Sequence, residues 1–316
     1  MSLPPPPSLL HASDRWSPSA PCAVAVGNFD GVHLGHAEIV RRLTGLAAAR
    51  RLPTAVLTFD PHPAAVLRPE SAPPPLSTPR RRAELLAALG VDAVFVQATD
   101  QQLTSLSAEN FYRDILRGRL AAAAIVEGAD FRFGAGRSGD VSLLSRLCRD
   151  DGIPMEVVEP VMADGEPVSS SRIRSLVGSG LVAEANRLLT AAYRLSGTVV
   201  AGAKRGRAIG FPTANLSGIE TLVPAGGVYA GRARSPSSAS QAWHSAAIHI
   251  GPNATFGETG VSVEVHLIGF EGDLYGQQLD VDFLGRLRET RRFASVDLLA
   301  EQLRRDVAEA AKIVTH

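Results

Sequence analysis

The sequence predicts an α/β domain with a parallel sheet, followed by an antiparallel β domain that ends in a helix. Up to about residue 190, apolar strand segments alternate with amphipathic helices, as in a parallel sheet covered on both faces. From Tyr193 onward, short apolar runs are separated by Gly, Pro and Asn, which is typical of an antiparallel barrel or sandwich. We therefore expect a disordered Pro-rich tail at residues 1–20, a first domain at 21–190 and a second at 191–316.

The composition supports two globular domains. The chain has 316 residues, more than one hydrophobic core usually serves. Lys+Arg and Asp+Glu both number 32, a balance that argues against a general binder of nucleic acid or anionic membranes, whose surface is usually basic. Cys22 and Cys148 lie far apart, and neither has a partner at metal-ligand spacing. Because no run is as long as a membrane span and no secretory signal is evident, we expect a protein of the reducing cytoplasm.

The elements of the first domain follow from hydrophobic periodicity. Strands are predicted where apolar residues run together, at 23–26, 54–59, 92–96, 121–126 and 155–158. Helices are predicted where apolar residues recur at helical spacing, at 34–50, 80–89, 108–117, 141–150, 170–177 and 182–189. The prolines of Asp60–Pro63 must end the second strand, because proline cannot donate to a sheet. The segments GNFDG, FDPHP and EGADFRFG each follow a strand. Parallel strands end at one edge, so we expect these segments to meet in one cleft.

The second domain is expected to contain short strands between turn residues, at 195–200, 227–232, 246–250, 261–270 and 278–283. Within the fourth of these, residues 261–267 alternate cleanly between apolar and polar types. A final amphipathic helix is predicted at 295–314, with apolar residues at helical spacing at Leu298, Leu299, Leu303, Val307 and Ala310.

The turn after the first strand has the features of an anion site. Small and polar residues from Gly27 to Gly31 lead to His33 and His36 at the mouth of the helix 34–50. Helix N-termini present backbone N–H groups and a dipole that favour an anion, and imidazoles are donors that can carry positive charge. Taken alone, the histidine pair favours an ordinary βα turn with solvated side chains. The complete string GNFDGVHLGH points instead to phosphate binding.

GNFDGVHLGH resembles the HxGH signature of the nucleotidylyltransferase superfamily, and VSSSRIR at 168–174 resembles its second motif, ISSTxIR. Attack on an α-phosphate builds negative charge that positioned donors and cations stabilise. The resemblance implies that His33, His36 and Arg174 are catalytic and act on the triphosphate of ATP, although Arg174 alone would pass for a surface arginine. The other residues that it implies at ATP are Gly27, Asn28, Phe29, Asp30, Gly35, Ser170 and Ser171.

Two further segments, TFDPHP at 58–63 and DFRFG at 130–134, resemble motifs of the flavin adenylyltransferase branch. They imply flavin contacts from His62, Asp130, Phe131 and Phe133, since aromatic rings suit a planar ligand. Core packing is an equally good explanation for either phenylalanine alone. Residues 134–139 match GxGxxG, but they do not join the first strand to its helix, so we reject the dinucleotide fingerprint and expect a flexible loop beside the nucleotide.

The second dense stretch, GAKRGRAIGFPTAN at 202–215, contains glycines and basic residues able to wrap phosphates. Thr213 and Asn215 supply neutral oxygens that suit Mg²⁺ bound to ATP. Residues 204–207 alone would fit a solvated basic hairpin, whereas GRxxGFPTAN closely resembles the riboflavin kinase signature. This resemblance implies ATP contacts from Gly202, Lys204, Gly206, Gly210, Pro212, Thr213 and Asn215, the last two also as Mg²⁺ ligands.

Downstream segments match the same signature: PAGGVYA at 224–230, SVEVH at 262–266, DLYG at 273–276, LRE at 287–289 and RF at 292–293. They imply that Glu264 is the general base for the 5′-hydroxyl of riboflavin, and that Tyr229, Arg288 and Phe293 contact the flavin. Side chains alternate along a strand, so Glu264 shares a face with Ser262 and His266. The alternation alone leaves open whether this face meets solvent or ligand.

Together, residues 22–314 resemble the bacterial bifunctional riboflavin kinase/FAD synthetase family. The resemblance implies a Rossmann-like nucleotidylyltransferase domain that adenylylates FMN to FAD, and a six-stranded barrel with a C-terminal helix that makes FMN from riboflavin. It also implies ATP with Mg²⁺, no tightly bound organic cofactor, no nucleic-acid or membrane partner, and a monomer or weak homo-oligomer.

The chain departs from the family at three places: Thr190–Tyr193 replaces Gly-Arg-Pro-Tyr, His249 replaces Asn, and Ala254 replaces Pro. Because the last two fall in the kinase domain, a chain with only adenylyltransferase activity is an alternative. A flavin-binding regulatory protein without turnover is another. It would need none of the catalytic side chains present at His33, His36, Arg174, Thr213, Asn215 and Glu264.

Overall fold

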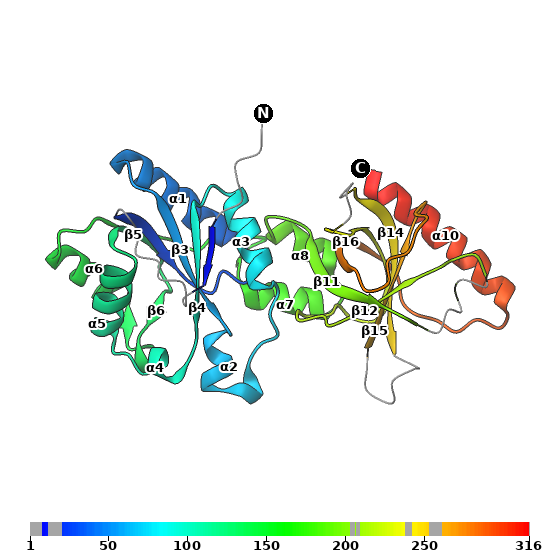
Figure 1. The fold of residues 1–316 in the computed structure, drawn as a ribbon, viewed down its shortest axis with the longest axis horizontal. Coiled ribbons are helices and arrows are strands. Elements are labelled where there is room, and N and C mark those ends of the chain that lie inside the picture. Colours follow the sequence, from blue (N-terminus) through cyan, green and yellow to red (C-terminus); the bar gives the residue numbers. More distant parts are fainter. Residues whose placement is uncertain are drawn as a thin grey trace. The chain divides into compact units, whose positions relative to one another are not determined.

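The computed structural model describes residues 8–11, 21–202, 206, 209–237, 242–252 and 261–315 (Figure 1). Lys204 and Ala254 lie outside these residues. Contacts divide the chain into two compact units, Met1–Ser170 and Ser171–His316. Within the described residues, no helix is both long and apolar enough to cross a membrane.

The first unit is built on a parallel sheet with the strand order β1-β4-β3-β2-β5-β8. Its strands are β1 (Ser8–His11), β2 (Cys22–Val26), β3 (Thr54–Asp60), β4 (Ala93–Ala98), β5 (Ala122–Gly128) and β8 (Met155–Val158). The chain runs outward from β2 through β3 to β4 and then continues on the other side at β5. The order therefore reverses between β2 and β5, where ligands bind in folds of this class.

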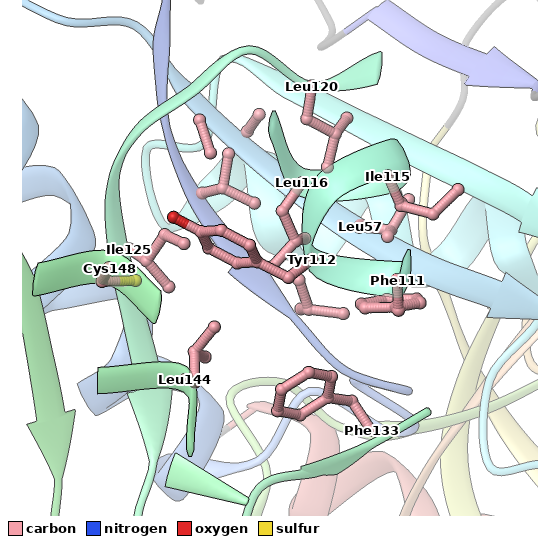
Figure 2. Packing of buried hydrophobic residues seen from close by; sticks show 14 of the residues in the cluster. Leu57, Phe111, Tyr112, Ile115, Leu116, Leu120, Ile125, Phe133, Leu144 and Cys148 are labelled. Carbon is pink, nitrogen blue, oxygen red and sulfur yellow. The ribbon is translucent and has the colours of Figure 1, made fainter. Parts of the chain in front are cut away.

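Both faces of this sheet are covered, which confirms the predicted α/β class. Helices α1 (Leu34–Arg50) and α3 (Pro79–Ala88) pack on one face. The π-helix η2 (Phe111–Arg119) and α6 (Val141–Asp150) pack on the other. Figure 2 shows this second core, in which Tyr112, Leu116 and Leu144 surround Ile125 of β5. Because both faces of the sheet are buried, its strands are runs of apolar residues.

Two local expectations for the first unit are wrong. Residues 8–11 of the predicted disordered tail form β1, which pairs with the otherwise open edge of β4; an unpaired edge offers backbone groups to any extended segment. The predicted flexible loop at 134–139 is a tight hairpin of β6 (Arg132–Phe133) and β7 (Gly139–Asp140). Gly134 has a φ of 73°, and a Cβ there would lie 2.6 Å from the backbone nitrogen of Ala108. The hairpin is thus packed onto the protein.

The remaining elements of the first unit are short. They are α2 (Pro63–Leu67), η1 (Pro69–Ser71), α4 (Gln101–Thr104), α5 (Ala108–Asn110), η3 (Ala135–Arg137), β9 (Met162–Ala163) and β10 (Glu166–Pro167). The helix predicted at 108–117 is thus one turn of α-helix that continues as the π-helix η2.

The second unit contains a closed antiparallel barrel with the order β11-β12-β15-β14-β13-β16, which decides between barrel and sandwich. Its strands are β11 (Tyr193–Val200), β12 (Ala214–Ser217), β13 (Gly227–Arg234), β14 (His244–Pro252), β15 (Val261–Leu267) and β16 (Gln278–Arg288). The C-terminal helix α10 (Val296–Thr315) packs on β13, β14 and β16. The six strands and the helix confirm the predicted second fold.

Helices α7 (Ser170–Gly178) and α8 (Val182–Leu188) fall largely in the second unit. Asn186 of α8 fastens that helix to the barrel, because its Nδ2 donates to the carbonyl of Phe283 and its Oδ1 accepts from the backbone N–H of Tyr193, both at 2.8 Å. The two compact units thus divide at 170/171, before the domain boundary expected at 190/191. The expected boundary remains a prediction.

Candidate active sites

The turn between β2 and α1 has a strained backbone. Phe29 and Val32 have φ values of 46° and 42°, and Gly31 has 81°. Only glycine adopts this region without strain, so the surroundings must hold the other two residues. Phe29 is fully buried in the core beneath α1. Its ring is thus held inside the protein, and its contact with ATP remains a prediction.

His33 and His36 cap helix α1 reciprocally. The backbone N–H of His33 donates to Nδ1 of His36 (3.2 Å), and the backbone N–H of His36 donates to Nδ1 of His33 (3.4 Å). The two rings stack with centroids 3.6 Å apart. An imidazole nitrogen that accepts a hydrogen bond carries no proton, so each neutral ring must carry its proton on Nε2. Because the capping bonds use Nδ1 of each ring, the two Nε2–H donors take no part in the cap.

The structure makes His36 a neutral donor rather than the cation that the sequence allows. Burial lowers the pKa of His36 well below its ordinary value, and the nearby His33 and Arg82 lower it further. A lowered imidazole pKa means that the ring of His36 stays neutral from alkaline pH down through pH 6.5, so that its Nδ1 can accept the hydrogen bond from His33 over that range. Gly35 leaves the His33 ring just enough room, because a Cβ would lie 3.1 Å from that ring.

Asp30 anchors the turn from inside. Its carboxylate accepts hydrogen bonds from the backbone N–H of Leu76 and Ser77 and from the Ser77 hydroxyl, all at 2.9–3.0 Å. The Arg82 guanidinium lies 3.7 Å from it. Asp30 is only 2% exposed, so its carboxylate holds the turn from within, and its role at ATP remains a prediction. A carboxylate this deeply buried has to be paired, and its partners here are protein groups.

We expect Asp30→Ala to lower the free energy of unfolding of the first unit by about 3–5 kcal/mol, since it leaves the Arg82 charge buried without its carboxylate. The matched control is Asp114→Ala, which breaks the exposed pair with Arg113 and should cost less than about 1 kcal/mol. Urea unfolding followed by circular dichroism measures both changes. Equal losses in the two variants would contradict the anchoring role.

Asn28 and His62 meet at the carboxyl edge of the sheet, 2.9 Å apart between Nδ2 and Nε2. Nδ1 of His62 accepts from the backbone N–H of Ala64 at the start of α2, so Nε2 of the neutral ring carries the proton. The Asn28 amide must then present its oxygen to His62. The structure therefore brings together the GNFDG and FDPHP segments, as predicted.

The serines at the start of α7 extend this edge. The Ser170 hydroxyl donates to the carbonyl of Asp30 at 2.9 Å, which ties the second motif to the first within the first unit. Ser171 is exposed and Arg174 half-buried on α7, and both belong to the second unit. Their roles at the triphosphate remain predictions.

The aromatic residues after β5 divide between core and surface. Phe133 is only 5% exposed and packs on Phe111 with ring centroids 5.9 Å apart, so its ring belongs to the core, and its flavin contact remains a prediction. Phe131 is half-buried and stacks on Phe133 at 5.4 Å, and Arg132 pairs with Asp140. The exposed Asp130 and the half-buried Phe131 remain candidates for a flavin contact.

The barrel places the proposed kinase residues in one row across its strands. Asn215 of β12 is directly opposite Glu264 of β15, which is opposite His249 of β14. Paired residues share a face. Val263 and Val265 point into the barrel core, so the row faces outward. His249 was noted only as a departure from the family. Burial lowers its pKa, Glu264 acts to raise it and Arg288 to lower it, so the imidazole lies in the field of the proposed base.

The segment before β12 covers part of this outer face. His266 Nδ1 lies 2.8 Å from the carbonyl oxygen of Pro212, and its ring meets Phe211 edge-on at 5.6 Å. Thr213 is exposed, Gly210 has a φ of 85°, and a Cβ on Gly202 would overlap the Asn215 amide at 2.2 Å. The glycines therefore let the chain pass closely over the row.

A cavity of about 330 Å³ opens at the same end of the barrel. Its lining includes Leu267, Phe270, Leu274 and Gln277. The carbonyl of Gln277 accepts from the backbone N–H of Val199 at 2.9 Å, next to the end of β11 from which the glycine-rich segment leaves. The cavity thus combines apolar walls with nearby polar groups, as small-ligand sites do.

Two barrel residues that are predicted to contact the flavin also make structural contacts. Tyr229 is fully buried, its hydroxyl donates to the carbonyl of Ala225, and its ring packs edge-on against Phe283. Arg288 pairs with Asp306 of α10 at 2.7 Å and so fastens the helix to the barrel. The flavin contacts of both residues remain predictions. Phe293 is half-buried, with Arg291 4.9 Å from its ring, and its role remains a prediction.

We expect Tyr229→Phe to leave the KM for riboflavin unchanged within about twofold and to lower stability by about 1 kcal/mol, because the substitution removes one buried hydrogen bond. Steady-state phosphorylation assays and thermal unfolding measure the two effects. If the substitution raised the KM for riboflavin tenfold and left the stability unchanged, the result would support a direct contact between Tyr229 and the flavin.

Sequence reasoning missed Arg82 and Glu127 near the sites, and it named His249 only as a departure from the family. Arg82 is buried on α3 and donates to the Thr58 hydroxyl at 2.7 Å. Its place among Ala83 and Leu86 on the buried face of a helix was a usable signal. His249 of β14 is identified by its pairing with Glu264 of β15. Glu127 ends a strand that otherwise reads as apolar, and a lone carboxyl in such a run is a recognisable exception.

Comparisons with known proteins cover nearly the whole chain. A family model described as FAD synthetase matches residues 17–172, and one described as riboflavin kinase matches residues 189–314. A bifunctional riboflavin kinase/FMN adenylyltransferase of Pseudomonas fluorescens is 38% identical over 92% of both chains. One of Escherichia coli K12 is 35% identical over 92% of both. A crystal structure described as a macrolide-efflux protein from Streptococcus pneumoniae is similar, with a TM-score of 0.83 and 33% identity over 93% of this chain and 94% of that one.

Proposed function

This chain belongs to the bifunctional riboflavin kinase/FMN adenylyltransferase family, and we propose how its residues divide the two reactions. The enzyme phosphorylates riboflavin to FMN with ATP in its C-terminal domain and adenylylates FMN to FAD in its N-terminal domain. The observation that supports the division best is that His33, His36 and Ser170 lie in the first unit, whereas Asn215 and Glu264 are register partners in the second.

In the first unit, His33 and His36 donate their Nε2–H groups to the triphosphate of ATP. A phosphate oxygen of FMN attacks the α-phosphorus, the bond from that phosphorus to the bridging oxygen breaks, and pyrophosphate leaves. Negative charge grows on the non-bridging and leaving oxygens, and fixed donors stabilise it without reorganising. The reciprocal capping bonds fix both donors before the substrate arrives. Arg174 supplies the positive charge that neutral histidines do not.

In the second unit, Glu264 accepts the proton of the riboflavin 5′-hydroxyl as that oxygen attacks the γ-phosphorus, and ADP leaves. The base and Asn215 are register partners on adjacent strands, so the hydroxyl and the phosphates are brought to one face. The cavity near Phe270 and Gln277 takes the nucleoside of ATP. His249 flanks the base on the other side.

The kinase residues also fit Mg²⁺. Thr213 and Asn215 offer a hydroxyl and an amide oxygen close to the glycine-rich segment, and hard oxygen ligands with phosphate oxygens suit this ion. Among the described residues, no three His, Cys, Asp or Glu side chains form a metal cluster. When bound, the ion neutralises charge on the β- and γ-phosphates.

The substrates and products we propose are riboflavin, ATP, FMN and FAD. Both cysteines are free and buried, which supports work in the reducing cytoplasm. A monomer or weak homo-oligomer, without nucleic-acid or membrane partners, is sufficient for this chemistry, because each set of reacting groups comes from one chain.

One assay tests the proposal. Purified protein is incubated with riboflavin and Mg·ATP, and the products are separated by chromatography over time. FMN followed by FAD supports two working sites. FAD made only from added FMN would favour the adenylyltransferase alone, a result for which His249 beside Glu264 would be the first candidate cause. Bound flavin without product would indicate a regulatory binder.

A further inference from the structure

A carboxyl group that the reactions above do not use lies next to the adenylyltransferase turn. Glu127, near the end of β5, is only 1% exposed. Its Oε1 accepts a hydrogen bond of 2.7 Å from the backbone N–H of Val26, the last residue of β2. Gly27 follows Val26 directly, so this carboxyl holds the point at which the turn begins.

The place of Glu127 in the sheet explains why a side chain is needed there. The parallel register of β2 and β5 runs through Cys22–Ala122, Ala23–Ala124 and Val24–Ile125 and goes no further. The strand order reverses between these two strands, and at such a point they part to leave a ligand crevice. Glu127 thus supplies to Val26 the acceptor that the β5 backbone no longer provides.

The surroundings of Glu127 favour its uncharged form. Among the described residues, no basic group acts on it, and its strand neighbours Val26 and Val157 are apolar. A buried carboxylate without a counter-ion is costly. Burial raises the pKa of Glu127 well above its ordinary value; the hydrogen bond from Val26 acts to lower this pKa, and Asp130 in the next turn acts to raise it.

The other titratable groups facing this position are also neutral below pH 9. Cys148 on α6 interacts with Glu127, and burial raises the pKa of this thiol to about 11. Tyr112 on η2 lies beside Cys148, and burial raises its pKa as well. Asp130 is therefore the remaining carboxyl group that interacts electrostatically with Glu127.

We propose that Glu127 is a positioning residue of the adenylyltransferase site: a neutral carboxylic acid that bridges β2 and β5 and fixes the start of the Gly27–Val32 turn. This role of Glu127 rests on the proposed function, because the turn positions the two histidines at the triphosphate. A neutral group suits this place, since a carboxylate would repel the negative charges of ATP from inside the protein.

Two substitutions separate the contributions of shape, hydrogen bond and charge. Glu127→Gln keeps the oxygen that accepts from Val26 and cannot ionise. Glu127→Leu keeps most of the volume and removes the acceptor. Glu159→Gln, at an exposed position after β8, is the matched control for a lost surface charge.

Thermal unfolding between pH 5 and pH 9 tests the charge state without using activity. A carboxyl whose folded pKa is raised stabilises fully below its unfolded value near 4.5 and loses that contribution as pH rises toward the folded pKa. The Tm advantage of Glu127→Gln over the wild type should therefore grow with pH, by on the order of 3 °C for each pH unit. A constant difference, as expected for Glu159→Gln, would overturn the neutral-acid assignment.

FMN adenylylation tests the positioning role. At pH 7, Glu127→Gln should keep kcat within about threefold, whereas Glu127→Leu should lower it about tenfold or more through the lost acceptor. Riboflavin phosphorylation by the same samples should not change. Wild-type kcat in Glu127→Leu, or loss in Glu127→Gln equal to that in Glu127→Leu, would overturn the proposal. If the wild type made no FAD, the proposed function would fail, and the Tm series would still decide the charge state.

Discussion

Replacing His36 by alanine is expected to lower FMN adenylylation by about 10²–10³-fold, the usual effect of removing one fixed donor from a charge-stabilising site. The donor is the Nε2–H group, which is neutral because burial lowers the pKa of His36. Riboflavin phosphorylation should stay within about twofold, since it depends on groups of the other unit. Coupled chromatography of FMN and FAD measures both rates.

Alanine also removes the Nδ1 acceptor that caps α1, so two further variants are needed. His36→Asn can keep an acceptor near the Nδ1 position and lacks the Nε2 donor. His36→Gln places an amide N–H near the Nε2 position. The donor role predicts that Asn is as inactive as alanine and that Gln recovers part of the rate. Full activity in His36→Asn would assign His36 to capping alone.

Replacing Glu264 by glutamine is expected to lower FMN formation by about 10²–10⁴-fold, the range for loss of a general base. Glutamine keeps the size of the side chain and its place opposite Asn215 and His249, so the loss reports proton acceptance rather than packing. FAD formation from added FMN should be unaffected.

Glu220→Gln is the control for Glu264→Gln, because it removes an exposed charge from the loop after β12. It should retain both activities. A Glu264→Gln enzyme that still makes FMN at the wild-type rate would exclude this residue as the base. His249 would then be the first alternative to examine, since it is the adjacent titratable group in the same row.

The sequence predicts the architecture well where burial sets a clear period. Helix α1 and strand β8 begin and end at the predicted residues, because their apolar spacing and flanking turn residues agree. Strand β12 was not predicted, since only four residues, Ala214–Ser217, pair there, and a polar asparagine lies among them. Strand β1 was missed because its pairing depends on an open edge far away in the sequence.

Motif matching located the sites but not the direction of each side chain. Asp30, Phe133 and Tyr229 belong to the matched segments, yet all three side chains are buried. A conserved-looking pattern does not distinguish a residue that touches the ligand from one that holds the backbone in place. Glu127 and Arg82 show the converse, because contacts between distant segments give them roles that no local pattern indicates.

The most direct test of the divided enzyme uses His36→Ala and Glu264→Gln separately and mixed, with riboflavin and Mg·ATP. The account predicts that His36→Ala accumulates FMN, that Glu264→Gln makes FAD only from added FMN, and that the mixture converts riboflavin to FAD. Loss of both activities in either folded variant would contradict the assignment of one reaction to each unit.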